Sequence, residues 1–320
     1  MPLEVATTIN QLDAANPTAT DPKSQGDDHL RLLKSTVKAT FPNVAGVVTP
    51  SHTELNYLTG AVGQIQTGGD LRNLLVNANF AINQRVWLTS AATTVANQAT
   101  LDRWRVVTLG QGITFGSAAP DRVVSCPAGG LEQAVEAEWV VGGVYTLSWV
   151  GTAVGRVNGA IVANGAQTAA IAANTSITVQ FSSGTVVRAQ LELGTVATPF
   201  QRRPPGLELM LCQRDYCKSY PMASPQGTAS SPGSDQGYLA VGGAITAKIN
   251  FPVPMRSVPS VLLWSNNGVA AQWVAFTTGA VATSYAATTT LVTERNATVS
   301  VLVAGGEVLS TGQWAAATGF

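Results

Sequence analysis

Residues 199–220 read PFQRRPPGLELMLCQRDYCKSY and lie between two regions with β-strand patterns. Apolar and aromatic residues recur in this stretch at intervals of three and four, which places them on one helix face. They are Leu209, Cys212, Tyr216 and Tyr220. Pro204 and Pro205 favour extended backbone before the stretch, and Pro221 cannot continue a helix. The pattern predicts a single amphipathic helix over residues 207–220 that connects the two β regions.

The composition favours a protein built from sheets. Only 11% of the 320 residues are charged, and 18 Lys and Arg balance 18 Asp and Glu. This balance leaves no basic field that could hold nucleic acid. Low charge with many small and β-branched residues is typical of stacked sheets with tight turns. A chain of this length can hold two or three cores, and we expect three segments.

The sequence indicates neither secretion nor membrane insertion. Residues 1–8 lack the basic start and apolar core of a signal peptide. No run of about eighteen apolar residues could form a membrane-spanning helix. Three cysteines, Cys126, Cys212 and Cys217, are too few for a disulfide scaffold, and we expect them to be reduced and buried.

The first 71 residues contain an irregular arm and two predicted short helices. The arm covers residues 1–24, and a helix is expected over residues 27–40, capped by Ser24, with Leu30, Leu33 and Val37 on one face. Residues 49–60 carry a cap residue, a proline at the first helical position and a terminal glycine, which predicts a second helix. A Gly- and Gln-rich linker follows over residues 61–71. A segment of this size cannot bury a substantial core alone, so we expect it to oligomerise or dock.

This segment resembles the N-terminal part of bacteriophage tail-fibre and related virion-appendage proteins. The resemblance rests on residues 16–18 (NPT), 21–35 (DPKSQGDDHLRLLKS), 41–43 (FPN) and 53–58 (TELNYL). It implies that residues 1–71 attach the chain to a baseplate, tail or other virion protein. The implied anchoring candidates are Asp21, Lys23, Asp27, Asp28, Leu30, Leu33, Leu55, Tyr57 and Leu58.

Strand patterns dominate residues 72–203. Apolar and polar residues alternate over residues 103–106, 144–149, 177–181 and 187–193, which predicts strands with one packed and one solvated face. Several such strands separated by Gly and Asn turns favour a β-sandwich or jelly roll. The segment also resembles the fibre family at residues 73–85, 102–104, 131–133, 145–149 and 190–200, where it looks like a carbohydrate-binding-module jelly roll. Residues 212–216 (CQRDY) are similar to a fibre motif with two adjacent aromatics, although this chain has only Tyr216 there.

Residues 204–320 are expected to contain the linking helix and a second, distal β-sandwich. Residues 222–237 are dense in Ser, Pro, Gly and Gln, which predicts a long exposed loop. Strands are predicted over residues 245–251, 261–264, 273–277, 291–293 and 299–303. Residues 251–261 (FPVPMRSVPSV) resemble the distal β-domain of the fibre family. The predicted fold class is therefore mainly β: an N-terminal arm with two short helices, a jelly-roll β-sandwich, a linking helix and a distal sandwich.

Catalytic chemistry finds little support in the sequence. Glu132, Glu136 and Glu138 are the densest acidic cluster, but Glu136 and Glu138 alternate as solvent-facing strand residues would. Both histidines, His29 and His52, precede the β regions, so no Ser-His-acid triad can be assembled there. No phosphate-loop motif occurs. We therefore predict no catalytic residues, no metal site and no cofactor.

Sugar recognition needs aromatic faces together with amide and hydroxyl groups. The distal region has both, and the receptor-binding candidates are Trp264, Asn266, Asn267, Gln272, Trp273 and Tyr285. Trp273 and Asn267 are favoured because they lie near a glycine-containing loop. Core packing is the open alternative for each aromatic residue.

Three functions remain open. The first is a homotrimeric phage tail fibre, a virion protein assembled in the host cytoplasm, whose C-terminal domain binds a surface glycan such as lipopolysaccharide. The trimer is implied by the resemblance, and several weak sites on one assembly would gain avidity. The second is a glycan-cleaving appendage, and the third is a purely structural head fibre or connector.

Overall fold

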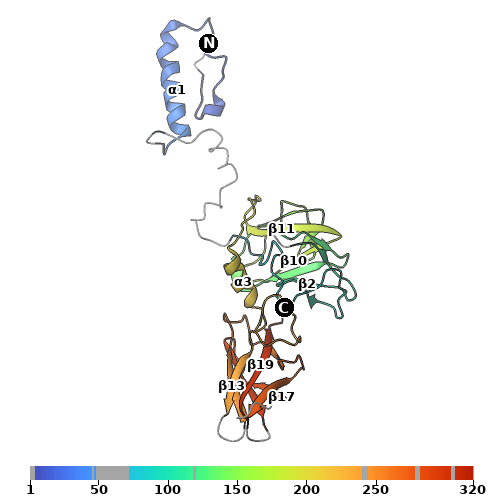
Figure 1. Cartoon of the computed structure of the whole chain (residues 1–320). Coiled ribbons are helices and arrows are strands. Elements are labelled where there is room, and N and C mark those ends of the chain that lie inside the picture. The colour runs from blue at the N-terminus through green and yellow to red at the C-terminus, as the bar shows by residue number, and fades with distance from the viewer. Residues whose placement is uncertain are drawn as a thin grey trace. The chain divides into compact units, whose positions relative to one another are not determined.

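The computed structural model describes residues 4–44, 47, 72–117, 120–239, 244–277, 282–303 and 307–319. The chain divides into two compact units, Met1–Thr59 and Gly60–Phe320, of which the second holds all the described strands (Figure 1). The prediction of a mainly β protein is confirmed. Neither α-helix in the described part of the chain is long and apolar enough to cross a bilayer.

The first unit contains η1 (Ile9–Gln11), η2 (Lys23–Gln25) and α1 (Gly26–Thr40). The predicted helix is present and begins one residue earlier than expected, because Ser24 lies inside the preceding 3-10 turn instead of capping the helix. The arm contacts one side of α1, where the amide of Ile9 donates to Thr40 Oγ1 over 2.9 Å and Thr36 is fully buried. The predicted second helix and the linker over residues 61–71 lie outside the described residues.

The apolar stripe on α1 is left uncovered by this unit. Leu30, Leu33 and Val37 are 60%, 48% and 44% exposed, respectively. Full burial of a Val or Leu side chain contributes about 1.5–3 kcal/mol, and about half of that remains to be gained at each of these positions. That this segment needs a partner surface therefore remains a prediction, and the face of α1 with these three residues is the one expected to meet the partner.

The first part of the Gly60–Phe320 unit consists of two antiparallel sheets around one core. One sheet has the strand order β1-β2-β5-β10-β7-β8 and the other the order β3-β4-β11-β6-β9. The strands are β1 (Gln98–Ala99), β2 (Arg105–Val106), β3 (Thr114–Phe115), β4 (Val124–Cys126), β5 (Leu131–Val135), β6 (Tyr145–Val150), β7 (Val154–Val157), β8 (Ala160–Val162), β9 (Ala166–Gln167), β10 (Ile177–Ser182) and β11 (Gly184–Leu193). Trp149 from one sheet packs edge-on against Phe181 from the other, with ring centroids 5.3 Å apart.

Two strand predictions in this part need correction. The strand expected over residues 103–106 is only Arg105–Val106, because Arg103 adopts a positive φ of 69° in a turn. In β11 both faces are covered over residues 189–192, so the alternation with a solvated face is wrong there, while Arg188 remains exposed. Gln190 and Glu192 are buried because the returning chain satisfies them: the amide of Gln201 donates to Gln190 Oε1 over 2.7 Å, and the amide of Thr198 donates to Glu192 Oε1 over 2.8 Å.

The predicted helix over residues 207–220 is too long. The structure has α3 (Pro205–Gln213), which begins at a proline, followed by a turn and β12 (Tyr216–Lys218). Tyr216 and Tyr220 therefore do not share a helix face with Cys212. Helical spacing misled the prediction because residues 216–218 find a better backbone partner in the C-terminal strand, where Tyr216 pairs with Ala317.

The remaining strands form the distal part of the unit. They are β13 (Asp235–Leu239), β14 (Ala244–Asn250), β15 (Ser260–Trp264), β16 (Gln272–Thr277), β17 (Ala282–Thr290), β18 (Asn296–Leu302) and β19 (Glu307–Ala317). β19 pairs with β13 on one side and β16 on the other, which closes β13, β14, β18, β17, β16 and β19 into a ring. The expected second sandwich is thus a closed ring of strands, referred to below as the barrel. The strand predicted over residues 291–293 is absent, since Leu291 is exposed and has a φ of 48°.

A tryptophan fills the barrel. Trp273 is fully buried, together with Ile245, Ile249 and Val299. A Cβ on Gly312 of the neighbouring strand would lie 2.2–2.5 Å from three ring atoms of Trp273. This strand position therefore accommodates no side chain.

The Gly312→Ala variant tests this packing. We expect it to lower the free energy of unfolding by about 2 kcal/mol, because overpacking a dense core forces neighbours to shift. The measurement is urea unfolding, with Gly206→Ala in α3 as the control, since a Cβ there has nothing within 4 Å. Equal midpoints for the two variants would contradict the packing argument.

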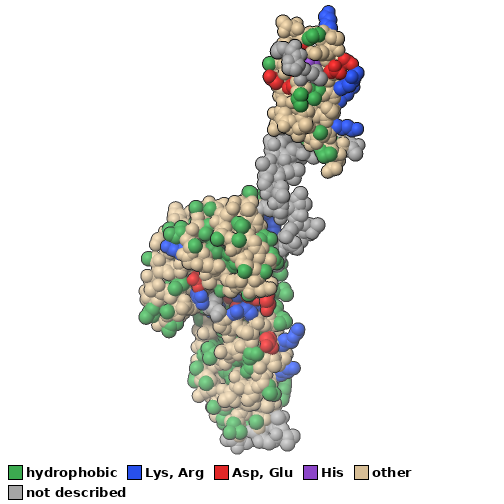
Figure 2. Space-filling view, turned by 180° about the vertical axis from the view of Figure 1, so that it is seen from behind, with side chains coloured by type: hydrophobic (Ala, Val, Ile, Leu, Met, Phe, Trp, Pro, Cys, Tyr) green, Lys and Arg blue, Asp and Glu red, His purple; other side chains and the backbone are tan. Residues whose placement is uncertain are grey.

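A group of charged side chains joins the first β part to the barrel. The Asp215 carboxylate contacts Arg103 of the first part, and Arg256 Nε of the distal part donates to it over 3.0 Å. Arg214 pairs with Glu136 at 3.0 Å. Gln84 Nε2 donates 2.9 Å to the carbonyl of Tyr216, and the Arg85 guanidinium lies 3.8 Å from the centre of the Tyr216 ring. Figure 2 shows acidic and basic side chains close together about midway along the larger unit.

Asp215→Asn should uncouple this junction. It leaves two arginines facing a neutral amide, and breaking a buried pair typically costs about 3–5 kcal/mol. We expect a lower urea midpoint with separate transitions of the two parts. Asp121→Asn is the matched control: Asp121 also contacts two arginines, but these are 47% and 45% exposed, so the loss should be about 1 kcal/mol or less. Asp215 with Arg103 and Arg256 is referred to below as the clamp. Similar losses of unfolding free energy in both variants would refute its role in joining the two parts.

The prediction of buried, unbridged cysteines is confirmed. Cys126, Cys212 and Cys217 are free and buried. Burial raises the pKa of Cys126 and of Cys217 to about 12 and holds the pKa of Cys212 well above its ordinary value. The reactive thiolate is therefore scarce at neutral pH.

Thiol titration at pH 8 should give no rapid reaction with the folded chain and three equivalents after unfolding in guanidinium. The thiol-specific disulfide reagent DTNB measures both. A thiol that reacts within seconds in the native protein would show that one of these residues is accessible.

Candidate functional site

The structure does not bring the predicted distal residues together as an open aromatic surface. Trp273 is fully buried in the barrel, and Trp264 is 9% exposed and packs edge-on against Tyr220 at 6.1 Å. Both rings lie in the core, which is the packing alternative that the sequence left open, and neither presents a face to a ligand. A strand pattern shows that two faces differ but not which one meets solvent.

Of the other distal candidates, Asn266 and Asn267 lie between β15 and β16, Gln272 begins β16 and Tyr285 lies on β17. Asn267 is exposed, and Gln272 and Asn266 are half-buried. Asn266 Nδ2 lies 3.5 Å from Thr311 Oγ1, while its buried Oδ1 has no partner. Tyr285 pairs across the strands with Trp273, and its hydroxyl donates to Glu307.

The anchoring candidates lie on one small unit. Asp27 and Asp28 both pair with Arg31 on the first turns of α1, and Asp21 Oδ2 accepts from the amide of Thr18 over 2.8 Å. Lys23, Leu30 and Leu33 are exposed. Leu55, Tyr57 and Leu58 lie outside the described residues.

Two of the three glutamates considered for catalysis form ion pairs with arginines. Glu132 pairs with Arg105, and Glu136 pairs with Arg214. Glu136 is therefore not the solvent-facing strand residue that alternation suggested: β5 ends at Val135, and the chain turns into η3 (Ala137–Trp139). Glu138 is exposed.

Metal ligands do not cluster in the part of the chain that the structure describes, where no three His, Cys, Asp or Glu side chains come together. His29 lies on α1 and is half-buried, and its Nε2 has no hydrogen-bond partner. His52 lies outside the described residues.

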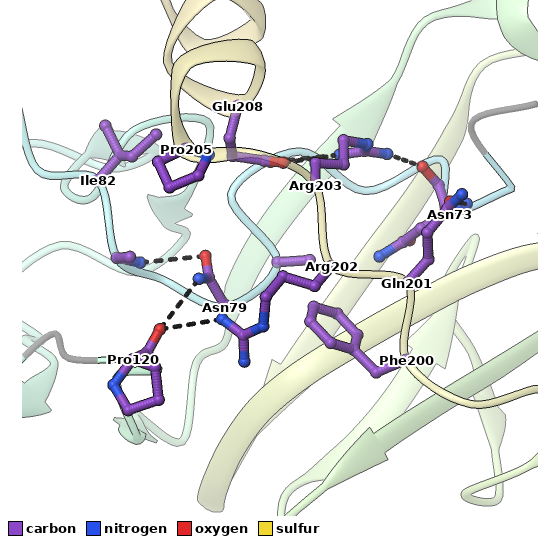
Figure 3. Close-up of a pocket in the computed structure, with 12 residues that line it drawn as sticks. Asn73, Asn79, Ile82, Pro120, Phe200, Gln201, Arg202, Arg203, Pro205 and Glu208 are labelled. Atoms are coloured by element: carbon purple, nitrogen blue, oxygen red, sulfur yellow. Dashed lines mark hydrogen bonds and ion pairs between the residues drawn. The ribbon is translucent and has the colours of Figure 1, made fainter. Parts of the chain in front are cut away.

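A cleft that the sequence did not suggest lies beside the start of α3 (Figure 3). Its volume is about 520 Å³. Ligand pockets of drug size cover roughly 300–1,000 Å³, so the cleft can hold a small organic ligand. Its lining residues are Asn73, Ala78, Asn79, Ala81, Ile82, Pro120, Phe200, Gln201, Arg202, Arg203, Pro205 and Glu208. Ile82 and Pro205 lie on one side and Phe200 on the other, with Asn79 and Arg202 between them.

A buried arginine connects two chain segments at the cleft. Arg203 Nη1 donates over 2.9 Å to the carbonyl of Leu75 and pairs at 3.2 Å with Glu208, and Nη2 donates to the carbonyl of Asn73. Glu208 also accepts from the amide of Asn77. Only Nε of Arg203 lacks a partner, although it is buried. Pairing of the other donors holds this side chain in place.

The second arginine of the cleft is half-exposed. Arg202 Nη2 pairs with Asp121 at 2.6 Å, and its Nη1 donates over 3.2 Å to the carbonyl of Pro120. Arg188 contacts the same carboxylate at 2.7 Å. Burial alone would raise the pKa of Asp121, but hydrogen bonds and charge from the two arginines outweigh it, so this pKa lies below its ordinary value. The three groups carry a net charge of +1, which is available to an anion.

Sequence reasoning missed the cleft because its lining comes from segments more than a hundred residues apart. Residues 73–82 and 200–208 carry polar and aromatic side chains outside any strand pattern, which is a weak signal for a functional loop. The pattern does not show that the two segments adjoin. The hydrogen bond between the Asn73 amide and Gln201 Oε1, at 2.9 Å, brings them together.

Comparisons with known proteins show no family for this chain. No protein-family model matches it, and no curated protein sequence does. Among solved structures it is similar to recombinant discoidin II of Dictyostelium discoideum, with a TM-score of 0.15 and 12% identity over 70% of this chain and 87% of that chain. A TM-score this low carries no argument about fold or function.

Proposed function

We propose that this chain is an attachment protein of a bacteriophage virion, of the tail-fibre type. Residues 1–71 dock on a baseplate, tail or other virion protein, and the Gly60–Phe320 unit binds a glycan of the bacterial surface. In this proposal the two sheets that share the first core form a jelly roll of the carbohydrate-binding-module kind. The chain acts as a homotrimer on the virion and is assembled in the host cytoplasm.

The division of labour between the two units carries the proposal. The first is small and leaves Leu30, Leu33 and Val37 uncovered on α1, as expected of a segment that is completed by a partner. The second is held as one unit by the ion pairs of Asp215 with Arg103 and Arg256 and by the hydrogen bond from Gln84 Nε2 to the carbonyl of Tyr216. A docking segment joined to a rigid β unit is what an appendage needs to transmit contact from a cell surface to a virion.

Binding fits the chemistry of the second unit better than glycan cleavage. Hydrolysis of a glycosidic bond uses two carboxyl groups about 5–10 Å apart that are available to the substrate. Glu132 and Glu136, the carboxylates considered for that role, are engaged by Arg105 and Arg214. The cleft, in contrast, offers an aromatic ring, amides and guanidinium groups, which suit recognition.

The full chain, fluorescently labelled, should bind susceptible bacterial cells and be displaced by polysaccharide purified from the same cells. Binding through several weak sites should fall steeply when the protein is diluted to monomer, because avidity is lost. Flow cytometry measures the first effect, and sedimentation velocity gives the oligomeric state.

A reducing-sugar assay on the same polysaccharide distinguishes the alternatives. Release of reducing ends that Glu136→Gln abolishes would replace the adhesin by a cleaving enzyme. Absence of cell binding for any host tested, combined with binding to isolated virion proteins only, would instead indicate a head fibre or connector.

A further inference from the structure

The geometry points to the cleft beside α3 as a binding site for a short acidic saccharide, held by its carboxylate and by one sugar face. This inference rests on the proposed function and names a ligand class and a location for it. The location differs from the distal turn that the sequence favoured. It lies in the first β part of the Gly60–Phe320 unit.

The shape and lining of the cleft suit a sugar. Its volume of about 520 Å³ can take about two sugar rings. Phe200 packs against the first core and also lines the cleft, so it can present a flat apolar face to a pyranose ring. Asn79 and Gln201 add amide groups to the lining.

The charges select an acidic ligand. The cleft and the ion-paired group beside it contain Arg202, Arg203 and Arg188 against Glu208 and Asp121, which leaves one positive charge. Guanidinium groups bind carboxylates through charge-assisted hydrogen bonds. Arg202 is 45% exposed and is held in place by Asp121 and the carbonyl of Pro120, so it is pre-positioned at the cleft.

Arg203 also lines the cleft, but its side chain is only 3% exposed and its Nε is shielded from the cleft as well as from solvent. The guanidinium group that a ligand can reach is therefore that of Arg202, which is 45% exposed.

The test is calorimetric titration of the full chain with acidic trisaccharides, namely a galacturonate trimer, a sialylated trimer and a trimer containing ketodeoxyoctonate, and with neutral maltotriose. We expect at least one acidic trimer to bind and maltotriose to bind at least tenfold more weakly. Failure of all three acidic trimers, or equal affinity for maltotriose, overturns the inference.

Two arginine variants form a matched pair. Arg202→Gln and Arg188→Gln each remove one half-exposed ion pair with Asp121, but only Arg202 lines the cleft. Arg202→Gln should weaken binding of the acidic trimer about tenfold or more, while Arg188→Gln should change it by about twofold or less. Equal losses of affinity in the two variants would show that only the overall positive charge attracts the ligand, and would refute the cleft as its binding site.

Phe200→Leu tests the aromatic contact while keeping an apolar side chain against the core. We expect about fivefold weaker binding with an unchanged circular dichroism spectrum. Unchanged binding would remove the sugar-stacking part of the argument. If the variant fails to fold, Ala81→Phe, which adds bulk inside the lining, takes its place and should reduce binding equally.

Cell binding separates failure of this inference from failure of the proposed function. If the Arg202→Gln variant binds cells as well as the unmodified chain does, the glycan is held elsewhere. The cleft is then refuted as the binding site, while the proposed attachment function stands. If acidic trimers bind in the cleft but the chain attaches to no bacterium, the cleft is supported and the attachment function fails.

Discussion

The carboxylate of Asp215 lies between Arg103 of the first β part and Arg256 of the distal part, and the junction of these two parts of the Gly60–Phe320 unit depends on this contact. Side chains of Arg103 and Asp215 are only 4% and 9% exposed. A buried ion pair gains little unless further hydrogen bonds complete it, and here they do. Arg103 Nη2 donates over 2.9 Å to the carbonyl of Ala134, and the backbone carbonyl of Asp215 accepts from the amide of Thr318 over 2.9 Å.

The clamp explains why α3 is short. A helix continuing past Gln213 would carry Tyr216 and Cys217 around its axis and away from β19. Ending it allows Asp215 to face Arg103 and allows β12 to pair with the C-terminal strand. The same connector places Glu208 of α3 against Arg203, so one stretch of chain forms both the junction and one wall of the cleft. A cleft on such a braced segment can keep its donors in position before a ligand arrives.

The structure also separates two kinds of aromatic residue that composition alone does not distinguish. Trp273 and Trp264 fill interiors, and their loss as candidates moves attention from the barrel to the first β part. Phe200 remains because its segment runs along the outer side of β11, where the core is covered by returning chain and not by another sheet. Side chains in such a covering segment can serve the core and a cleft at once.

Local patterns determined much of this protein. The mainly β class, helix α1, the strands β6, β10 and β14 and the burial of the cysteines all follow from residue spacing and composition, because they depend on neighbours within a few residues. Tertiary structure alone decided the end of α3, the closing of the barrel and the cleft. Each depends on partners distant in sequence: Tyr216 with Ala317, β16 with β19, and Asn73 with Gln201. Periodicity reports which side chains share a face, but only the folded chain decides which backbone or charge that face meets.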